Sequence, residues 1–171
     1  MFLLFKIKSL LFIAITVQII YLFECNNLNR ALLTQWIPFG INSPFIDLDN
    51  RQIETIDPDT FTGLTTLTYL ELFSNKITDL DPTIFNGLTG LKSLTLYNNL
   101  LRIIDSGTFK QLINLEVLNL YNNKIIAIDY DVFVGLNNLK SVYFGLNPIT
   151  SIQQSYVLSL CKSNPRCKIY I

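Results

Sequence analysis

Residues 91–101 read LKSLTLYNNLL, and closely similar segments recur 24 residues before this stretch and 24 and 48 residues after it. The matching segments are LTYLELFSNKI at 67–77, LEVLNLYNNKI at 115–125 and LKSVYFGLNPI at 139–149. A phenylalanine keeps the same period, at Phe61, Phe85, Phe109 and Phe133. A period of this length that holds over successive units predicts a solenoid of stacked coils.

Each unit contains a short stretch in which leucine alternates with other residues, as at Leu94 and Leu96. This alternation predicts a strand whose leucines point into the core, and stacking the units then gives one parallel sheet. An asparagine follows each strand, and its amide suits the backbone groups left over where the chain turns away from the sheet. These asparagines are Asn75, Asn99, Asn123 and Asn147.

An aspartate opens the opposite side of each unit, four residues before the phenylalanine. Proline follows two of these aspartates, and the combination is typical of the first turn of a helix, where the carboxylate caps backbone N–H groups. We therefore expect a short helical or 3₁₀ turn there, with calcium binding as the alternative role of the carboxylates. The four aspartates are Asp57, Asp81, Asp105 and Asp129.

The segments quoted above follow the pattern L-x-x-L-x-L-x-x-N-x-I/L, and over roughly residues 45–152 the chain resembles the leucine-rich repeat (LRR) family. The unit is similar to the form common in extracellular animal LRR proteins. The resemblance implies an α/β solenoid: a right-handed curved stack of about five repeats, with a parallel β-sheet on the concave face and short helices or 3₁₀ turns on the convex face. It also implies partner binding through exposed strand residues, although a fold alone does not specify a function.

The N-terminal segment 1–25 is mostly apolar and is predicted to be a signal peptide. Its apolar run at residues 9–23 has the length of a signal-peptide core and is shorter than the ~20 residues that a membrane-spanning helix needs. Retention of this segment as a signal-anchor is the alternative. In both cases we expect the repeats to be exposed to the secretory lumen or the outside, in a secreted or a membrane-anchored protein.

Residues 26–44 lack the repeat pattern and are predicted to form an N-terminal cap over the apolar end of the stack. Asn29 is a good first residue for a short helix that carries an apolar stripe. We expect Trp36, Ile37 and Phe39 to cover the first repeat.

Residues 153–171 are predicted to form a C-terminal cap. The repeat columns continue into a helix at 153–160, after which the register slips by three residues. A terminal strand is expected at 168–171, with Ile169 and Ile171 in the two inward positions.

Two of the three cysteines, Cys161 and Cys167, flank a short turn. In a secreted chain they are expected to form a disulfide, and free thiols in a reducing compartment are the alternative. Cys25 precedes the first repeat, too many strands away to join them. It is removed with the signal peptide, left free or paired with another chain.

The composition narrows the class of function. The chain has no histidine, which is the commonest general base and metal ligand. It contains no glycine-rich phosphate loop and no CxxC motif. Thirteen basic and thirteen acidic residues balance, so no net charge attracts nucleic acid or an anionic membrane. We therefore expect neither an enzyme nor a protein that holds a cofactor or metal ion.

The exposed strand residues of successive units form the candidate contact surface. The main feature of this surface is an aromatic row of Phe73, Tyr97 and Tyr121. An acidic cluster of Asp47, Asp49 and Glu71 lies at the N-terminal end of the surface. These columns hold no lysine or arginine, which argues against nucleic acid and favours a protein or peptide partner. The residues predicted to contact that partner are Tyr69, Glu71, Phe73, Tyr97, Asn98, Tyr121, Asn122 and Tyr143.

Two classes of function compete. The first is a secreted or cell-surface, non-catalytic recognition module that binds its partner through the concave face. The second is a structural extracellular-matrix or surface protein whose aromatic face self-associates into a homodimer and so covers an exposed apolar patch. The aromatic row also has a purely structural interpretation, because aromatic residues at equivalent positions of adjacent strands stabilise a sheet by stacking.

Overall fold

The computed structural model describes residues 26–37, 40, 42–129, 131–149, 151–161 and 164–171. The predicted signal peptide, Cys25 and Phe39 lie outside these residues. In the described part, no helix is both long enough and apolar enough to cross a membrane.

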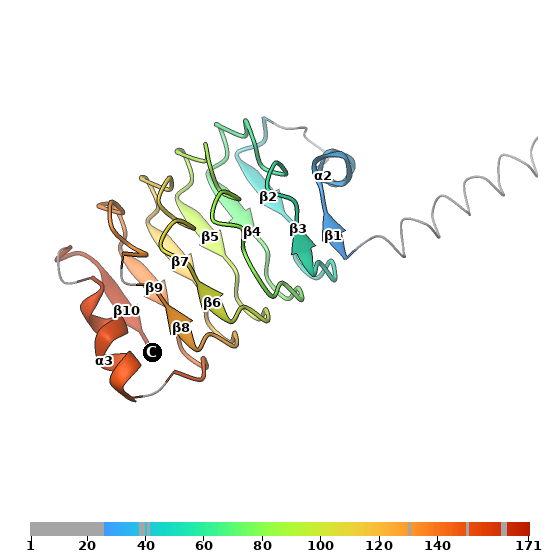
Figure 1. Cartoon of the computed structure of the whole chain (residues 1–171). Coiled ribbons are helices and arrows are strands. Elements are labelled where there is room, and N and C mark those ends of the chain that lie inside the picture. Colours follow the sequence, from blue (N-terminus) through green and yellow to red (C-terminus); the bar gives the residue numbers. More distant parts are fainter. Residues whose placement is uncertain (1–25, 38–39, 41, 130, 150, 162–163) are drawn as a thin grey trace, which may run out of the picture.

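One six-stranded parallel sheet runs along the whole stack (Figure 1). In consecutive repeats, residues one period apart are paired on neighbouring strands, so that Leu70 lies beside Leu94 and Leu94 beside Leu118. At the last step Ile169 lies beside Val142, which confirms the predicted slip of three residues. The strands, in spatial order, are β2 (Phe45–Asp47), β4 (Tyr69–Glu71), β5 (Ser93–Thr95), β7 (Val117–Asn119), β9 (Ser141–Tyr143) and β10 (Lys168–Tyr170).

The core is a continuous column of apolar side chains inside the stack. Phe61, Phe85 and Phe109 are fully buried, and successive ring centroids lie 6.2 Å apart in stacked pairs. The leucines that alternate along the strands are buried with them, as at Leu94 and Leu96. Each coil therefore buries its apolar residues against the coils on either side, as the period predicts.

The predicted asparagine ladder is present beside this core. Asn99 accepts a hydrogen bond from the Ile77 N–H (3.1 Å) and donates to the carbonyl oxygens of Leu72 (2.9 Å) and Leu96 (3.1 Å). Asn75, Asn123 and Asn147 make the equivalent bonds in their own coils. Each amide thus joins two coils through backbone groups inside the protein, and the Leu72 and Leu96 carbonyl oxygens each accept from the asparagines of two successive coils.

The side of the stack opposite the sheet carries short turns, which confirms the 3₁₀ alternative of the prediction. Successive i→i+3 hydrogen bonds, the 3₁₀ pattern, run for example from the Ile84 N–H to the Asp81 carbonyl and from the Leu88 N–H to the Phe85 carbonyl. Two small parallel ladders that were not predicted also join the coils: β1 (Asn27–Leu28) with β3 (Thr55–Ile56), and β6 (Ile103–Ile104) with β8 (Ala127–Ile128).

The aspartate column does not have one shared role. Asp81 caps its own turn by accepting from the Thr83 N–H (2.7 Å) and hydroxyl. The Asp57 carboxylate instead accepts from the Asn27 side chain, and the Asp129 carboxylate accepts from a backbone N–H of the preceding coil. The capping prediction is therefore wrong for these two positions, because the N-terminal cap and the preceding coil, respectively, offer a donor that competes with the local one.

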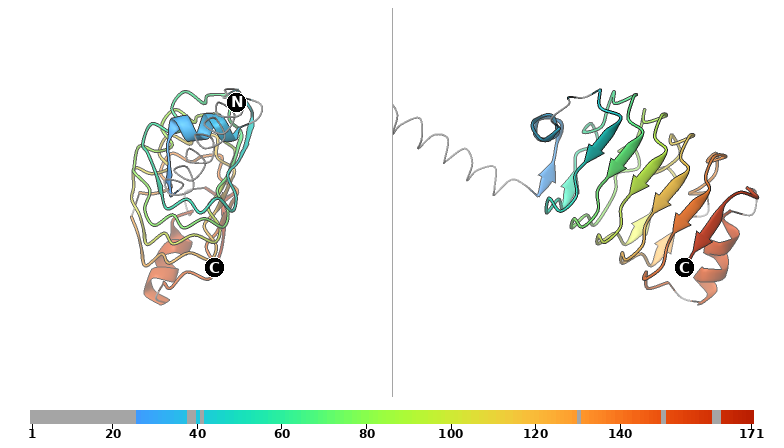
Figure 2. Two further views of the ribbon diagram at one scale, coloured as in Figure 1. Left: turned by 90° about the vertical axis from the view of Figure 1, so that its right-hand side faces the viewer. Right: turned by 180° about the vertical axis from the view of Figure 1, so that it is seen from behind.

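The N-terminal cap contains the predicted helix, α2 (Arg30–Trp36), which lies across one end of the stack (Figure 2). The Asn29 side chain accepts from the Leu32 N–H at 3.0 Å, which confirms its capping role. Leu33 and Ile37 are buried against the first coil, while Trp36 is half-buried beneath the Arg51 guanidinium.

The C-terminal cap consists of α3 (Ser151–Ser159), a turn and β10. The helix was predicted at 153–160, and its observed ends lie within two residues of that range. The Cys161–Cys167 disulfide is formed, with its Cα atoms 5.5 Å apart, and it links the residues after α3 to β10. Ile169 is partly buried as expected, whereas Ile171 lies outside the strand and is 46% exposed. The inward assignment of Ile171 is therefore wrong.

Candidate functional site

The exposed side of the six-stranded sheet, which we call the strand face, is the candidate site. The middle residue of each repeat strand is buried, and the first and third residues point outward, as the alternation predicts. On this face Tyr69 is 46% exposed and Tyr143 is 37% exposed, while Glu71 is partly exposed. The remaining predicted contact residues follow the strands in the turns that border the same face.

The aromatic row consists of Phe73, Tyr97 and Tyr121, each directly after an inward leucine. The rings of Phe73 and Tyr97 are stacked with centroids 4.8 Å apart, and the rings of Tyr97 and Tyr121 meet edge to face at 5.5 Å. Tyr121 then covers Gly145, where an added Cβ would come within 2.9 Å of the ring. The row is continuous and partly exposed, with Tyr121 the most exposed member.

A second aromatic pair extends the strand face toward the C-terminus. The rings of Tyr143 and Tyr170 are stacked with centroids 4.9 Å apart. Tyr170 was not among the predicted contact residues, although its place between two isoleucines in the terminal strand indicates an outward side chain. The same strand brings Lys168 onto this face, so the prediction of a surface without basic residues holds for the repeats and not for the terminal strand.

Asn98 and Asn122, which were predicted to contact a partner, also have a structural role. Both have left-handed backbones, with φ of 58° and 52°. The Asn122 amide donates to the Asn98 side-chain oxygen at 2.8 Å, and the Asn98 amide donates to the Ser74 hydroxyl at 2.6 Å. A short polar side chain tolerates this conformation better than most others do. These two amides therefore form a ladder along the border of the aromatic row.

The acidic cluster lies at the β2 end of the strand face. Asp47 and Glu71 occupy paired positions on neighbouring strands. The Asp49 carboxylate accepts the Phe73 N–H at 2.6 Å, and Asp47 accepts the Asp49 N–H at 2.9 Å. Burial raises the pKa of Asp49 above its ordinary value; the Phe73 hydrogen bond opposes this shift, and the charges of Asp47 and Glu71 add to it.

Two ion pairs lie outside this cluster among the described residues. At the border of the sheet, Lys140 contacts the Glu116 carboxylate, and the hydrogen bond from Lys140 lowers the pKa of Glu116. Lys76 lies 3.9 Å from Glu54. Among the described residues, no ion pair involves any carboxylate of the acidic cluster, which therefore keeps an uncompensated negative charge.

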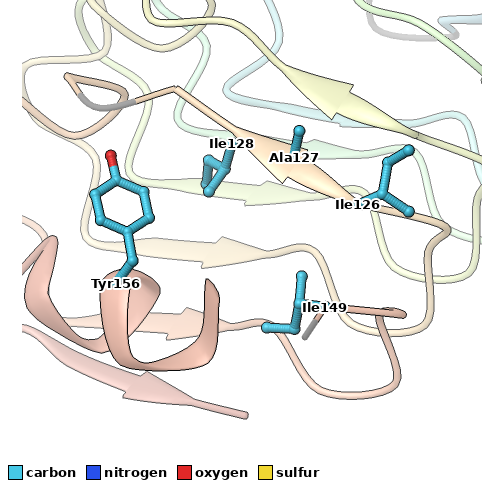
Figure 3. A pocket seen from close by; sticks show the side chains of 5 residues that line it. All are labelled: Ile126, Ala127, Ile128, Ile149 and Tyr156. Carbon is cyan, nitrogen blue, oxygen red and sulfur yellow. The ribbon is translucent and has the colours of Figure 1, made fainter. Parts of the chain in front are cut away.

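A small pocket lies away from the strand face, between β8 and α3. Its volume is about 90 Å³, and Figure 3 shows Tyr156 of α3 on one side and the β8 region on the other. Its lining is mostly apolar: Ile126, Ala127, Ile128, Ile149 and Tyr156. Over the part of the chain that the structure describes, no three His, Cys, Asp or Glu side chains are grouped to hold a metal ion.

The repeat architecture agrees with comparisons to known proteins. The leucine-rich repeat profile matches residues 46–101, 65–120 and 89–149. These matches together cover more than half of the chain, which belongs to the leucine-rich repeat family. No curated protein matches the chain.

Solved structures of leucine-rich repeat proteins share the fold. A chain of the Drosophila Toll–Spatzle complex is 26% identical with a TM-score of 0.66, and a chain of the TLR13–ssRNA13 complex is 29% identical with a TM-score of 0.66. Each match covers 73% of this chain, but 18% of the chain in the Toll–Spatzle complex and 17% of that in the TLR13 complex. The APL1 leucine-rich repeat domain is 28% identical with a TM-score of 0.68, covering 78% of this chain and 34% of that one.

Proposed function

We propose that this chain is a secreted or cell-surface, non-catalytic recognition module that binds a protein or peptide partner through the strand face. The observation that carries the proposal is the aromatic row of Phe73, Tyr97 and Tyr121, held on an open surface by the sheet beneath it. Aromatic rings supply large contact areas at low cost in conformational entropy, and they dominate the binding energy of many protein interfaces.

The surroundings of the row support a protein partner. The inward residues and the asparagine ladder fix the backbone, so that the outward side chains are presented in one arrangement before binding. One structural neighbour forms a complex with the protein Spatzle and another with single-stranded RNA. The acidic cluster repels phosphate groups, which favours the protein alternative for this chain.

Secretion is supported by the cysteine pair. A disulfide persists in oxidising compartments and is rare in the cytosol. Together with the signal-like sequence at residues 1–25, the Cys161–Cys167 bond is consistent with folding in the secretory pathway.

Site-specific photo-crosslinking tests the proposal. A photoreactive amino acid replaces Thr95, which points outward from β5 beside the row, or Val134, which is 65% exposed on a turn outside the sheet. The expected result is a covalent adduct to a distinct protein from position 95 and none from position 134. Adducts from position 134 alone would place the contact surface elsewhere and contradict the proposal.

Self-association is the second candidate, because several large apolar side chains stay exposed on the strand face. Phe45 is 49% exposed, and Tyr170 is 46% exposed at the opposite end. We propose light scattering on the purified protein as the deciding measurement. A dimer that becomes monomeric after Tyr97→Ala favours self-association, whereas a wild-type monomer favours a different partner.

A further inference from the structure

Three carboxylates, those of Asp47, Asp49 and Glu71, stand together at one end of the strand face, and no described cation forms an ion pair with them. Asp47 and Glu71 are directly paired on parallel strands, which lie about 4.8 Å apart in a sheet. Like charges in such positions repel each other and destabilise the sheet. The Arg51 guanidinium lies over the Trp36 ring, 4.8 Å from its centroid, and forms no ion pair with these carboxylates.

Aromatic rings border these carboxylates on two sides. Phe45 and Tyr69 form the outward pair two residues before Asp47 and Glu71, and both are about half exposed. Phe73 begins the aromatic row on the other side, and its backbone N–H already holds Asp49 in place. A cation bound here would contact carboxylates and ring faces together, an environment that suits the planar guanidinium of arginine in particular.

The distance between the acidic cluster and the aromatic row sets the spacing of the complementary groups on a partner. The carboxylates of Asp47 and Glu71 lie on the first two strands, β2 and β4, whereas Tyr97 and Tyr121 follow the next two, β5 and β7. The centres of these two pairs are therefore two strands apart across the sheet and two residues apart along it, or about 12 Å in total. An extended chain covers this distance in about three to four residues.

We infer that the strand face binds an extended segment of a partner protein in which a basic side chain lies about three residues from an aromatic or large apolar side chain. The basic group contacts Asp47 and Glu71, and the apolar group packs on Tyr97 and Tyr121. The inference rests on the proposed function and specifies the chemistry of the partner. Binding of the basic group relieves the repulsion between the Asp47 and Glu71 carboxylates.

Titration of the isotope-labelled protein with synthetic peptides, followed by NMR, tests this pairing. The probes are GSRSGFSG and the reverse order GSFSGRSG, with GSESGFSG as the charge-reversed comparison. At least one arginine peptide is expected to shift the backbone amides of Glu71 and Tyr97 together, while the glutamate peptide shifts neither. Raising the salt concentration is expected to weaken binding, because exposed ion pairs are screened.

Matched variants measure how much the charges of Asp47 and Glu71 contribute to the affinity for the arginine peptides. Asp47→Asn combined with Glu71→Gln is expected to weaken arginine-peptide binding about fivefold, the effect of losing roughly 1 kcal/mol from exposed ion pairs. The control pair, Asp79→Asn with Asp131→Asn, removes two exposed carboxylates outside the sheet and is expected to leave the affinity unchanged. Equal binding of the glutamate peptide, or no amide shift with either arginine peptide, would overturn the inference.

The failure of this inference is distinguishable from failure of the proposed function. A natural partner that still crosslinks from position 95 after Asp47→Asn and Glu71→Gln, with undiminished yield, would overturn the basic-segment inference and leave the proposed function standing. Loss of that crosslink in the same double variant supports both.

Discussion

The middle of the stack and its two ends bury apolar side chains by different means. In the middle, equivalent positions of neighbouring coils pack on one another, as in the stack of Phe61, Phe85 and Phe109. The ends have a neighbour on one side only. There α2 with Trp36, and α3 with the Cys161–Cys167 disulfide, replace the missing coil. Stability in the middle therefore follows from the repeat, and stability at the ends depends on features that occur once.

The largest predicted effect comes from the middle of the stack. Phe85→Ala removes a buried ring that packs between two others and is expected to cost about 3–5 kcal/mol of unfolding free energy. At the N-terminal end, Trp36→Ala is expected to cost about 1–2 kcal/mol, because that ring is half-buried and packs from one side. Urea unfolding of both variants measures the difference, and equal losses would remove the distinction between middle and end.

A second variant tests how the coils are joined. Asn99→Ala leaves the buried Ile77 N–H without its partner and removes one of the two asparagine bonds to each of the Leu72 and Leu96 carbonyl oxygens, so it is expected to cost roughly 1–3 kcal/mol. The thermal midpoint is the measurement, with the exposed Asn86→Ala as the comparison. An unchanged midpoint for Asn99→Ala would show that the ladder does not hold the coils together.

The disulfide is expected to act on the C-terminal end alone. Cys161→Ala with Cys167→Ala removes a short covalent loop, worth about 2 kcal/mol in the chain-entropy description. Hydrogen exchange should become faster at the backbone amides of β10 and remain unchanged at β5, because the coils between them stay packed. Faster exchange throughout the sheet would mean that the end and the middle unfold as one unit.

The smallest effect concerns the acidic cluster. The folded-state pKa of Asp49 is raised above the ordinary value of 3.8, so the folded protein holds this proton more tightly than the unfolded chain does. The contribution of Asp49 to stability therefore falls as the pH rises through the raised pKa. Asp49→Asn removes this penalty and keeps an oxygen for the Phe73 N–H. It should stabilise the protein slightly at neutral pH and have little effect below pH 3.8.

Asp81→Asn is expected to change the stability at neutral pH in the opposite direction from Asp49→Asn. The Thr83 hydroxyl lowers the pKa of Asp81, so its stabilising contribution is present above the ordinary value of 3.8 and is lost as the pH falls through the lowered pKa. This variant should be slightly less stable than the wild type at neutral pH. Chemical unfolding of the two variants over a range of pH measures both slopes.

The same contrast explains how far the sequence predicted the structure. The buried side chain of Leu94 and the backbone hydrogen bonds of Asn99 were predicted correctly, because the equivalent residue of every coil is buried or hydrogen-bonded in the same way. The ladders of β1 with β3 and of β6 with β8 were missed, since strands of two residues are too short to show alternation. Asp57 and Asp129 were misassigned because their donors lie in other coils.

In the candidate site, too, the sequence predicted some features and missed others. The outward direction of Tyr69 and Tyr143 and the continuity of the aromatic row follow from strand periodicity. The Asn98–Asn122 hydrogen bond depends on the left-handed turn after each strand, which the repeat pattern did not reveal. Binding by any of these residues remains a prediction, because it depends on a second molecule.

The affinity of the crosslinked partner for the Tyr97→Ala/Tyr121→Ala variant tests the central claim most directly. The account predicts that this variant loses binding, while the control Ile113→Ala/Val134→Ala, which shortens exposed apolar side chains outside the sheet, binds like the wild type. Unchanged affinity in a folded Tyr97→Ala/Tyr121→Ala protein would show that the aromatic row serves the sheet alone and that the partner binds elsewhere.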